Sequence, residues 1–463
     1  MSNEKNISDL RNKVEQINNV SCSFCTAKWL QTTLYLQNGY NHSCHHPAPH
    51  KIPLQEILED PAALHNSYFK KQQREKMLNG ERPSECDYCW KIEDLNKGYF
   101  SDRHIKTSDT NWAWDRFDEI ARSNPYDNVN PSYLEVSFSN VCNFACAYCS
   151  PDISSKWMED IVQNGPYPIE RASNSIDYLK HTGKYPYRHN EDNPYVDAFW
   201  HWFPEVFDSL KVFRITGGEP LLSKDTWKLI DWLKDKENKN CTIAFNTNLG
   251  IPDHLFKKFI KELEVLSPKF NKIDIFTSLE STGSQAEYAR DGINYEKFLE
   301  NLRTIMKASA ENVHFSIMTT VNILSLPSFS NFLEEFLKIR EEFHEGDGWE
   351  HSKITLSVNY LRWPMHLQCT LLDKEVREMY ADRIEALADK YVVSSLENPH
   401  NTIFYLEEAN AIKRFCDYLR SAETAVEHRA DFVKFISAYD QRRNKNFNNT
   451  FPEYNGVIEK WQG

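Results

Sequence analysis

The chain has 463 residues, a formal net charge of −13 and a mean hydropathy of −0.64. This length allows two or three domains, and the acidic balance argues against a long phosphate-tracking surface, so long nucleic acid is not an expected partner. No apolar run approaches the roughly 18 residues of a membrane span, and the first residues form no apolar signal segment. The composition therefore indicates a cytoplasmic protein without a membrane partner.

Eleven cysteines in such a chain indicate metal ligands or reactive thiols rather than disulfides, because a reducing compartment keeps thiols free. Eight of them lie before position 150 in tight groups. The other three are isolated in patterns of ordinary strand or helix. We expect these three, Cys241, Cys369 and Cys416, to be packed thiols.

The front of the chain carries a predicted hairpin. After a leader over residues 1–20, two β-rich runs at 30–37 and 40–43 are separated by Asn38-Gly39, a pair that favours a tight two-residue turn. The hairpin would bring a cysteine before the first run close to one after the second. Helical periodicity follows over residues 54–78, interrupted near Pro61.

A set of four cysteines lies around this hairpin and just beyond the helical segment. Four thiolates can saturate an iron–sulfur cluster, and with flanking histidines they can equally close a structural zinc site. Both readings stay open at this point. The set comprises Cys25, Cys44, Cys86 and Cys89, with Cys22 as a possible fifth ligand and His45 and His46 as the flanking histidines. We assign residues 21–98 to this domain and 99–132 to a linker.

From residue 133 short apolar runs alternate with amphipathic helices, which indicates parallel strands joined by crossover helices. We therefore expect the α/β fold class, with a partial (β/α)6 TIM-like barrel over residues 133–365 after a small α+β domain. An aromatic-rich insert at 150–210 is either a substrate-shaping element or part of the core. A helical extension covers residues 366–463. The expected strands are 134–137, 212–216, 242–248, 273–280, 315–322 and 355–361.

Directly after the first of these strands, Cys142, Cys146 and Cys149 form a CxxxCxxC pattern. Three thiolates can hold three irons of a four-iron cube and leave the fourth iron open for another ligand. A zinc site would need a fourth ligand close by, and the next histidine, His181, is distant in sequence. The spacing therefore predicts a cluster with one open iron.

Together with Gly217-Gly218-Glu219-Pro220, which follows the second strand, this pattern resembles the radical S-adenosylmethionine (SAM) superfamily over residues 133–365. The resemblance implies that the three thiolates hold a 4Fe-4S cluster whose open iron chelates the amino and carboxylate groups of SAM. It further implies that Gly217, Gly218 and Glu219 support the amino group and that Ser278 and Arg290 contact ribose and carboxylate. The remaining positions that it assigns to cofactor binding are Tyr148, Thr216, Asn246, Asn322 and Leu361.

The front segment resembles auxiliary-cluster domains of the twitch or SPASM type. Phe24-Cys25, Trp29, Gly39, Cys44 and the Cys86–Cys89 pair follow the order that such domains use. The resemblance implies a second 4Fe-4S cluster rather than zinc. Such domains usually follow the barrel, whereas this one precedes it, and this departure leaves the role of the second cluster open.

The superfamily resemblance implies a reaction type. An electron from a reductant such as flavodoxin or ferredoxin would split SAM, and the resulting 5′-deoxyadenosyl radical would abstract hydrogen from a substrate. The leading expectation is oxidative modification of a peptide, protein or amino-acid-like substrate. The alternative is a nucleotide, sugar or other small metabolite, and a second alternative is a non-catalytic iron–sulfur or zinc scaffold. The sequence identifies no catalytic acid, base or hydrogen donor.

Overall fold

The protein is described by a computed structural model that covers residues 2–95, 97–170, 175–343, 352–391 and 404–461. Parts of the expected insert (171–174) and of the expected C-terminal extension (392–403) lie outside the described residues. The chain divides into two compact units, which are described separately. The first unit comprises residues 1–140, 186–244 and 269–271, and the second comprises the remainder.

The sheet of the first unit has the strand order β3-β2-β1-β4-β5-β6. The pairs β1–β2 and β2–β3 are antiparallel, whereas β1–β4 and β4–β5 are parallel. This unit therefore joins a hairpin edge to the start of a parallel sheet. The strands are β1 (Gln31–Tyr35), β2 (Tyr40–His42), β3 (His50–Lys51), β4 (Tyr133–Ser137), β5 (Val212–Thr216) and β6 (Asn238–Asn246), which continues into the second unit.

The hairpin expected around Asn38-Gly39 is present as β1 and β2, with Thr33 opposite His42. Gly39 has φ +67°, and a Cβ there would lie 2.1 Å from the ring of Tyr195. Only glycine meets both conditions, the left-handed backbone and the close ring. The turn and the packing of the insert helix α11 (Pro194–Val206) thus depend on the same residue.

Strand β1 also pairs in parallel with β4, with Thr33 opposite Glu135 and Tyr35 opposite Ser137. The segment that carries the four front cysteines is therefore continuous with the sheet that leads to the CxxxCxxC loop. The sequence does not predict the pairing of β1 with β4, because the alternating pattern of residues 30–37 indicates a strand but not its neighbour.

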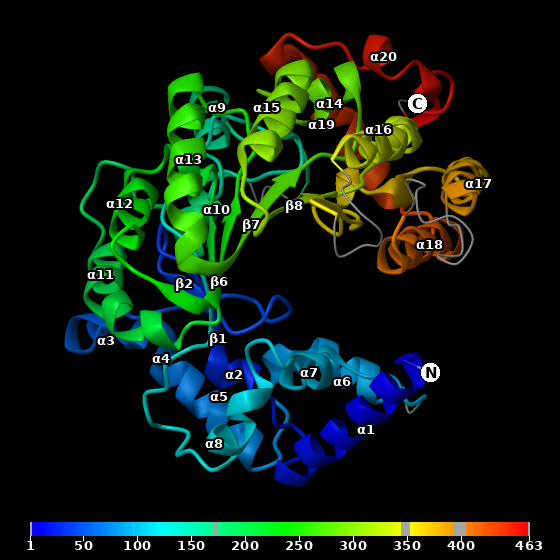
Figure 1. The fold of residues 1–463 in the computed structure, drawn as a ribbon. Helices are drawn as coiled ribbons and strands as arrows, with labels where there is room; N and C mark the ends of the chain where they lie inside the picture. Colours follow the sequence, from blue (N-terminus) through cyan, green and yellow to red (C-terminus); the bar gives the residue numbers. More distant parts are fainter. Residues whose placement is uncertain (1, 96, 171–174, 344–351, 392–403, 462–463) are drawn as a thin grey trace. The chain divides into compact units, whose positions relative to one another are not determined.

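Short helices surround the front hairpin, and Figure 1 shows α2, α5 and α7 close together at the base of β1. Their core is apolar and aromatic, and it includes Phe24, Trp29, Met77, Trp112 and Phe117. Apart from α11, the first unit contains the helices α1 (Ser2–Val20), α2 (Ala27–Leu30), α3 (Leu54–Glu59), α4 (Ala63–Asn66), α5 (Tyr68–Leu78), α6 (Asp87–Glu93), α7 (Asp102–Thr107), α8 (Phe117–Ala121) and α12 (Lys224–Leu233), together with the 3-10 turn η1 (Ser84–Cys86).

The periodic segment 54–78 forms three helices, with the expected break near Pro61 and a second break at Ser67. The hydroxyl of Ser67 accepts a hydrogen bond from the backbone N–H of Lys70 and so begins α5. A side chain that satisfies an orphan N–H can start a new helix without a proline, which is why the hydrophobic pattern alone missed this break.

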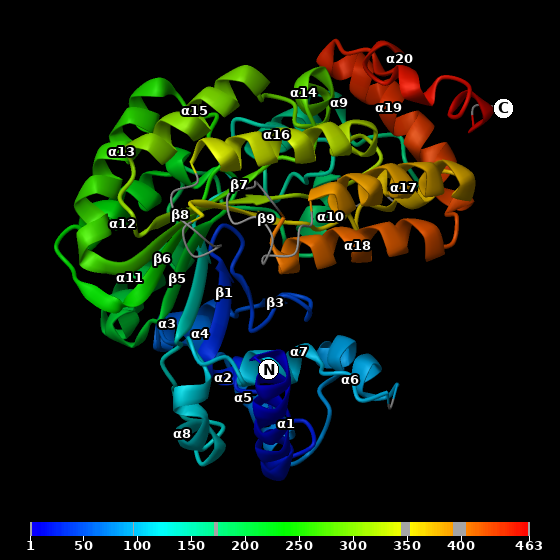
Figure 2. The same ribbon diagram turned by 45° about the vertical axis from the view of Figure 1, so that its right-hand side comes forward.

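The second unit contains parallel strands in the order β7-β8-β9. Within each unit the parallel strands thus follow the order of the sequence, as in the partial (β/α) barrel that we expected, and the α/β class is confirmed. In Figure 2, α17 and α18 lie side by side. The elements are α9 (Ser155–Asn164), α10 (Ile176–His181), α13 (Asp253–Leu266), β7 (Phe270–Ser278), α14 (Gly283–Ala289), α15 (Tyr295–Ala308), β8 (Val313–Met318), α16 (Phe329–Glu342), β9 (Ile354–Ser357), α17 (Lys374–Tyr391), α18 (Leu406–Ser421), α19 (Arg429–Arg443) and α20 (Phe447–Thr450).

Three strands of this unit end earlier than the sequence predicts, and polar side chains explain the difference for the last two. Strand β7 ends at Ser278. Strand β8 ends at Met318 and β9 at Ser357, where the Thr319 hydroxyl donates to the carbonyl of Asn359. The side chain of Asn322 bonds to neighbouring backbone groups, accepting from Leu324 N–H. Such local bonds compete with the ladder of a sheet.

Side chains predicted to be structural are buried. The thiols of Cys241, Cys369 and Cys416 are at most 2% exposed, which confirms them as packed. In the insert helix α11, Phe199 and Phe203 are fully buried, so the core reading of these aromatics is the correct one. No helix within the described ranges is long and apolar enough to span a membrane.

Candidate functional site

The CxxxCxxC loop follows β4 and belongs to the second unit. Its backbone is held by the segment after α14. The N–H of Ala145 donates to the carbonyl of Asp291 and the N–H of Ala147 donates to that of Ala289, both at 2.7 Å. The indole N–H of Trp157 on α9 donates to the carbonyl of Cys146 at 2.8 Å. These hydrogen bonds hold the backbone of the loop in place.

Phe144 anchors the loop between two glycines. A Cβ at Gly250 would lie 2.4 Å from the Phe144 ring, and a Cβ at Gly292 would lie 2.9 Å from the carbonyl oxygen of Asn143. Gly292 also has φ +108°, which side chains rarely tolerate. The amide of Asn143 adds a bond to the carbonyl of Gly250 at 2.7 Å. Two glycines distant in sequence thus fix one phenylalanine.

The three loop thiols, Cys142, Cys146 and Cys149, are half-buried and close enough to influence one another. Burial raises the pKa of the Cys149 thiol, and the neighbouring thiols of Cys146 and Cys142 raise it further. Negative sulfurs gathered in this way need a cationic centre to offset their repulsion. The N–H of Phe144 meets the Cys142 sulfur at 3.4 Å, a donor suited to a cluster thiolate.

The spacing of these sulfurs does not suit one zinc ion. Sulfurs bound to a single tetrahedral zinc at about 2.3 Å lie roughly 3.8 Å apart. Among the described residues, no three cysteine sulfurs of the chain lie within 4.8 Å of one another. A four-iron cube spreads its ligands over separate irons, and the loop fits that arrangement better.

A buried ion pair lies beside the loop. Arg290 binds the carboxylate of Glu280 with both prongs of its guanidinium, at 3.0 and 2.6 Å, and the Tyr148 hydroxyl donates to the same carboxylate at 2.9 Å. Glu280 is fully buried and Arg290 is 6% exposed. The positive charge of Arg290 lowers the pKa of Cys146 against the raising effect of burial. The expected carboxylate partner of Arg290 was that of SAM, whereas the structure gives it one within the chain.

The other predicted contact positions of this unit lie at or just after strand ends. Ser278 ends β7 and Asn246 ends β6, and both are half-buried. Asn322 is fully buried, and its amide donates to the Thr320 carbonyl at 2.8 Å. Leu361 follows β9, with its N–H bonded to the Val321 carbonyl. Their assignment to cofactor binding stays a prediction.

The Gly217-Gly218-Glu219 motif lies in the first unit at the end of β5, directly after Thr216. Gly217 has φ +135°, and a Cβ there would lie 2.9 Å from the carbonyl oxygen of Ser139. The N–H of Gly218 donates to that oxygen at 3.3 Å. Glu219 is 1% exposed, and its carboxylate accepts the N–H of Leu221. The motif therefore brings bare backbone to the end of β4, as a glycine pair that supports a cofactor would.

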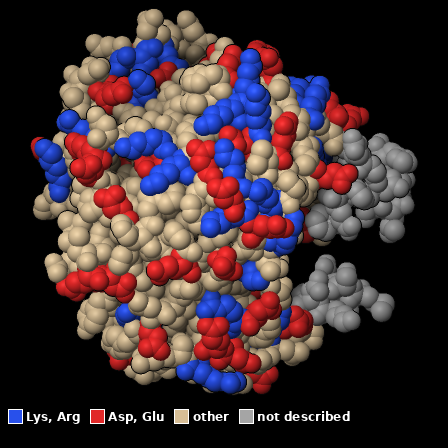
Figure 3. Space-filling model, turned by 60° about the vertical axis from the view of Figure 1, so that its left-hand side comes forward, with Lys and Arg blue, Asp and Glu red and all other residues tan. Residues whose placement is uncertain are grey.

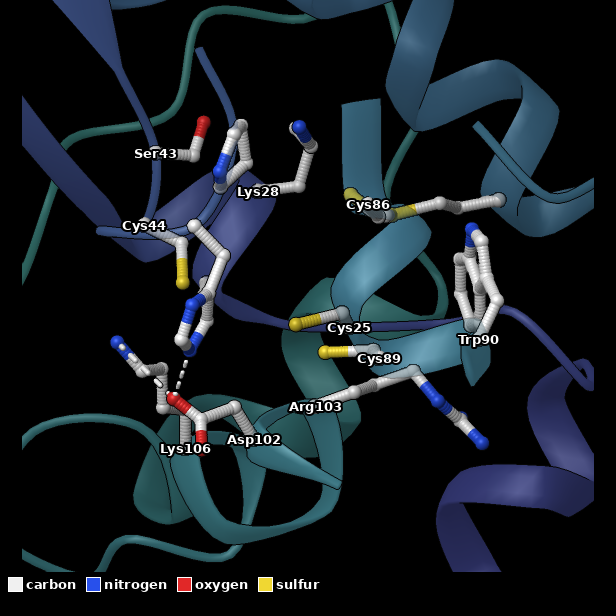
Figure 4. Close-up of a pocket in the computed structure, with 14 residues that line it drawn as sticks. Cys25, Lys28, Ser43, Cys44, Cys86, Cys89, Trp90, Asp102, Arg103 and Lys106 are labelled. Carbon is white, nitrogen blue, oxygen red and sulfur yellow. Dashed lines mark hydrogen bonds and ion pairs between the residues drawn. The ribbon is translucent and has the colours of Figure 1, made fainter. Parts of the chain in front are cut away.

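The front cysteines surround a pocket in the first unit, shown in Figure 4. The sulfurs come from four segments: the residue ahead of α2, the end of the hairpin, η1 and α6. The cavity that the pocket residues line has a volume of about 30 Å³. The structure thus brings together the four cysteines that sequence reasoning grouped, which are Cys25, Cys44, Cys86 and Cys89.

These thiols also act on one another electrostatically. Burial raises the pKa of Cys86 to about 12 and that of Cys89 to about 12, and in both cases the other pocket thiols contribute. No three of the four sulfurs come within 4.8 Å, so the described geometry does not form a closed zinc tetrahedron. Four thiol donors can ligate a four-iron cluster.

Cys22 and the flanking histidines are placed differently. Cys22 is exposed, bonds to the carbonyl of Gly80 at 3.3 Å and does not line the pocket. His46 lines the pocket, donates through Nε2 to the Asp102 carboxylate at 2.6 Å and stacks on Tyr88 with 3.7 Å between ring centroids. Together with Cys44, His46 and Asp102 form the group of three whose ligand atoms lie within 4.8 Å, so a single ion could bind at the rim.

Sequence reasoning did not assign Lys28 or Lys106 to either site, and it did not connect Glu280 with Arg290. Glu280 lies just after the strand that carries Ser278, a position that is typical of site residues in such sheets. Its bond to Arg290 cannot be predicted from the spacing of the two residues. Lys28 and Lys106 both line the cysteine pocket. The helical turn after Cys25 places Lys28 three residues on, and this is the only hint that the sequence offers.

Charged side chains elsewhere are mixed in sign. Figure 3 shows basic and acidic residues interspersed over the face that it presents. On the described residues of that face we see no broad basic stripe, which agrees with the acidic net charge.

Comparison with known proteins bears on the loop. Residues 136–338 match the family model of the radical SAM superfamily. The chain contains a radical SAM domain. The superfamily resemblance drawn from CxxxCxxC is thereby confirmed, and the radical SAM match begins inside β4 and extends through α15 into α16. The front cysteine segment lies outside the matched range, so its assignment as an auxiliary domain stays a prediction.

Curated relatives of this radical SAM chain bear one name. GTP 3',8-cyclase of Aliarcobacter butzleri is 26% identical over 223 residues, which is 47% of this chain and 58% of that protein. GTP 3',8-cyclase of Campylobacter lari is 23% identical over 213 residues, 45% of this chain and 52% of that protein. GTP 3',8-cyclase of Campylobacter jejuni subsp. doylei is 26% identical over 133 residues, 29% of this chain and 31% of that protein. The first two matches thus span little more than half of these relatives.

Proposed function

We propose that this chain is a radical SAM enzyme that modifies a nucleotide or a similar small metabolite. The observation that carries the proposal is the CxxxCxxC loop, held by backbone bonds to residues 289–291 and lying within the matched radical SAM range. The name of the curated relatives supports a nucleotide-like substrate over the peptide that the sequence led us to expect. Nothing in the comparisons supports the peptide.

A 4Fe-4S cluster with SAM would supply one-electron cleavage of SAM and a 5′-deoxyadenosyl radical. In our proposal Cys142, Cys146 and Cys149 hold that cluster. Arg290 provides positive charge beside the Cys146 thiolate, and Glu280 with Tyr148 keeps Arg290 in place. Gly217, Gly218 and Glu219 offer the amino group of SAM a close backbone and a carboxylate, and Ser278, Asn246, Asn322 and Leu361 remain candidate contacts.

We further propose a second cluster in the pocket of the first unit, held by Cys25, Cys44, Cys86 and Cys89. Four thiolates would ligate all four irons of a cube, and no iron would stay open for a substrate. The second cluster would then carry an electron rather than bind the substrate. A zinc ion in this pocket is the competing outcome.

Anaerobic reconstitution with metal and sulfide analysis tests both sites. About eight irons per chain are expected for two four-iron clusters, and about four irons with one zinc would contradict the second cluster. With dithionite and SAM the loaded protein should release 5′-deoxyadenosine. If a well-loaded protein releases none, the chain is a scaffold and not an enzyme.

The substrate class is tested by the same product. The rate of 5′-deoxyadenosine release should rise when GTP or another nucleoside triphosphate is added, and deuterium should move from labelled nucleotide into 5′-deoxyadenosine. A panel of mixed peptides at equal concentration is the control. Stimulation and deuterium transfer with peptides alone would restore the peptide as substrate and reject the nucleotide.

A further inference from the structure

The pocket of the front cysteines contains basic side chains as well as thiols. Lys28 comes from α2, and Arg103 and Lys106 come from α7 (Figure 4). Four thiolates leave a net negative charge whether they bind one zinc ion or a four-iron cluster. The three cations line the same pocket, where they can offset that charge.

Lys28 is 3% exposed, and it forms an ion pair with Glu85, which directly precedes Cys86. This ion pair holds the ammonium group of Lys28 at the wall of the pocket. Arg74 on α5 stabilises α2, which carries Lys28, by donating to the Lys28 carbonyl at 3.2 Å.

Lys106 approaches the pocket from the other side. It lines the pocket together with Cys44. Lys106 forms an ion pair with Asp102 at 4.0 Å, and Asp102 also binds His46. The ion pair of Lys106 is therefore long and shared.

Arg103 differs from the two lysines. Its guanidinium binds the Glu93 carboxylate at 2.9 and 3.0 Å, the carbonyl of Phe24 at 3.0 Å and the side chain of Asn18 at 2.9 Å. All of these bonds connect α7 to neighbouring segments. The role of Arg103 is therefore to hold the wall of the pocket.

We propose that Lys28 and Lys106 set the reduction potential of the cluster held by Cys25, Cys44, Cys86 and Cys89. This inference rests on the second cluster proposed above. Reduction adds one electron to the cluster and no proton, and the one-electron donor is oxidised in return. Fixed positive charges near the sulfurs stabilise the state with the extra electron and raise the potential, whereas the Glu85 carboxylate lowers it.

The two lysines are positioning residues, not ligands, and they make the pocket a better electron acceptor than four thiolates alone would be. This agrees with a saturated cluster that takes an electron from elsewhere and leaves substrate contact to other parts of the chain. The proposal separates the role of charge from that of ligation, so each can be changed alone.

The test is a dithionite titration with redox mediators, followed by electron paramagnetic resonance, on the full reconstituted chain. All proteins carry Cys146→Ala so that only the pocket cluster is observed. Lys106→Met should shift the midpoint potential downward, by about tenfold in the ratio of reduced to oxidised cluster at fixed poise, or ~59 mV for a one-electron couple. Glu85→Gln should shift it upward, because it leaves the charge of Lys28 without its carboxylate.

The test relies on Lys106→Met and Glu85→Gln, whose expected shifts have opposite signs. It does not depend on Lys28→Met, which leaves the nearly buried Glu85 carboxylate without its partner and can fail to load iron. Lys91→Met is the matched control, because Lys91 lies on α6 near Cys89 but is exposed and pairs with Asp87. It should leave the potential unchanged. Equal potentials in Lys106→Met, Glu85→Gln and the parent would overturn this inference while leaving the cluster in place, whereas zinc or no metal in the pocket would overturn the second cluster as well.

Discussion

The two cysteine sites of this chain are built in different ways. The CxxxCxxC loop gathers its thiols within residues 142–149, and backbone bonds to the segment after α14 give it its shape. Its nearby cation, Arg290, is closely bound to a buried carboxylate. The front pocket collects its four thiols from separate segments, and Lys106 on its wall forms a long ion pair, 4.0 Å, with an Asp102 carboxylate that also binds His46.

The two sites therefore differ in what the surrounding residues control, which is geometry at the loop and charge at the pocket. A three-cysteine site must keep one iron position open, so its loop has to be rigid before the cluster arrives. A four-cysteine site closes every position, and what remains to be adjusted is the potential. The predictions below break one site at a time and ask whether the other persists.

The largest effect is expected from Cys146→Ala. Loss of one of three ligands should remove the loop cluster and abolish 5′-deoxyadenosine release from SAM and dithionite, while the pocket keeps about four irons. Cys416→Ala, which changes a fully buried packed thiol, should retain both the release and the iron. Retention of activity in Cys146→Ala would reject the ligand assignment.

Cys86→Ala should have the reverse pattern. About four irons should be lost from the pocket, while dithionite and SAM still give 5′-deoxyadenosine from the loop site. Cys22→Ala is the control, since this exposed thiol lies outside the pocket and its loss should leave the iron content unchanged. Iron loss in Cys22→Ala but not in Cys86→Ala would show that we chose the wrong set of four.

Glu280→Gln tests the buried pair beside the loop. The change leaves the Arg290 charge buried without its carboxylate, and breaking such a pair costs about 3–5 kcal/mol of folding stability. Chemical denaturation of the protein before reconstitution measures this loss. Glu159→Gln on α9, in an exposed ion pair with Lys156, should cost less than about 1 kcal/mol. Equal stability of the two variants would mean that the pair does not hold the site.

The smallest effect is expected from Gly292→Ala. Backbone strain at φ +108° and contact with the Asn143 carbonyl together cost about 2–4 kcal/mol. Gly283→Ala also has positive φ but meets no atom within 4 Å, so it should lose only about 1 kcal/mol. Thermal unfolding of both variants separates the cost of positive φ, which both share, from the cost of crowding, which only Gly292→Ala has. Gly292→Ala should lose clearly more stability, and equal losses would show that the packing around Phe144 does not need Gly292.

Much of the catalytic half could be predicted from sequence because its signals are local. CxxxCxxC, Gly217-Gly218 and the apolar strands each lie within a few consecutive residues, and local patterns determine local structure. The grouping of Cys25, Cys44, Cys86 and Cys89 was also accessible, because an Asn-Gly turn identifies a hairpin. The structure places these four around one pocket.

Pairings between distant residues were not accessible. Nothing in the spacing shows that Arg290 turns toward Glu280, that Gly250 and Gly292 enclose Phe144, or that Lys106 faces Cys44. Such contacts depend on how whole elements pack, and a one-residue change of register would reverse them. The substrate class was not accessible for a related reason, since the sequence shows the radical SAM motif but not the molecule that reacts with the radical.

The parallel pairing of β1 with β4 has a consequence for how the protein is made. During synthesis the front hairpin leaves the ribosome well before residues 133–137, so β1 waits with an unsatisfied edge until its neighbour appears. A shortened gene that starts after residue 98 would leave β4 with the same open edge, exposed to other chains. The front segment is therefore a covering strand for the sheet as well as a cysteine site, and deleting it should produce aggregation before it reveals anything about electron transfer.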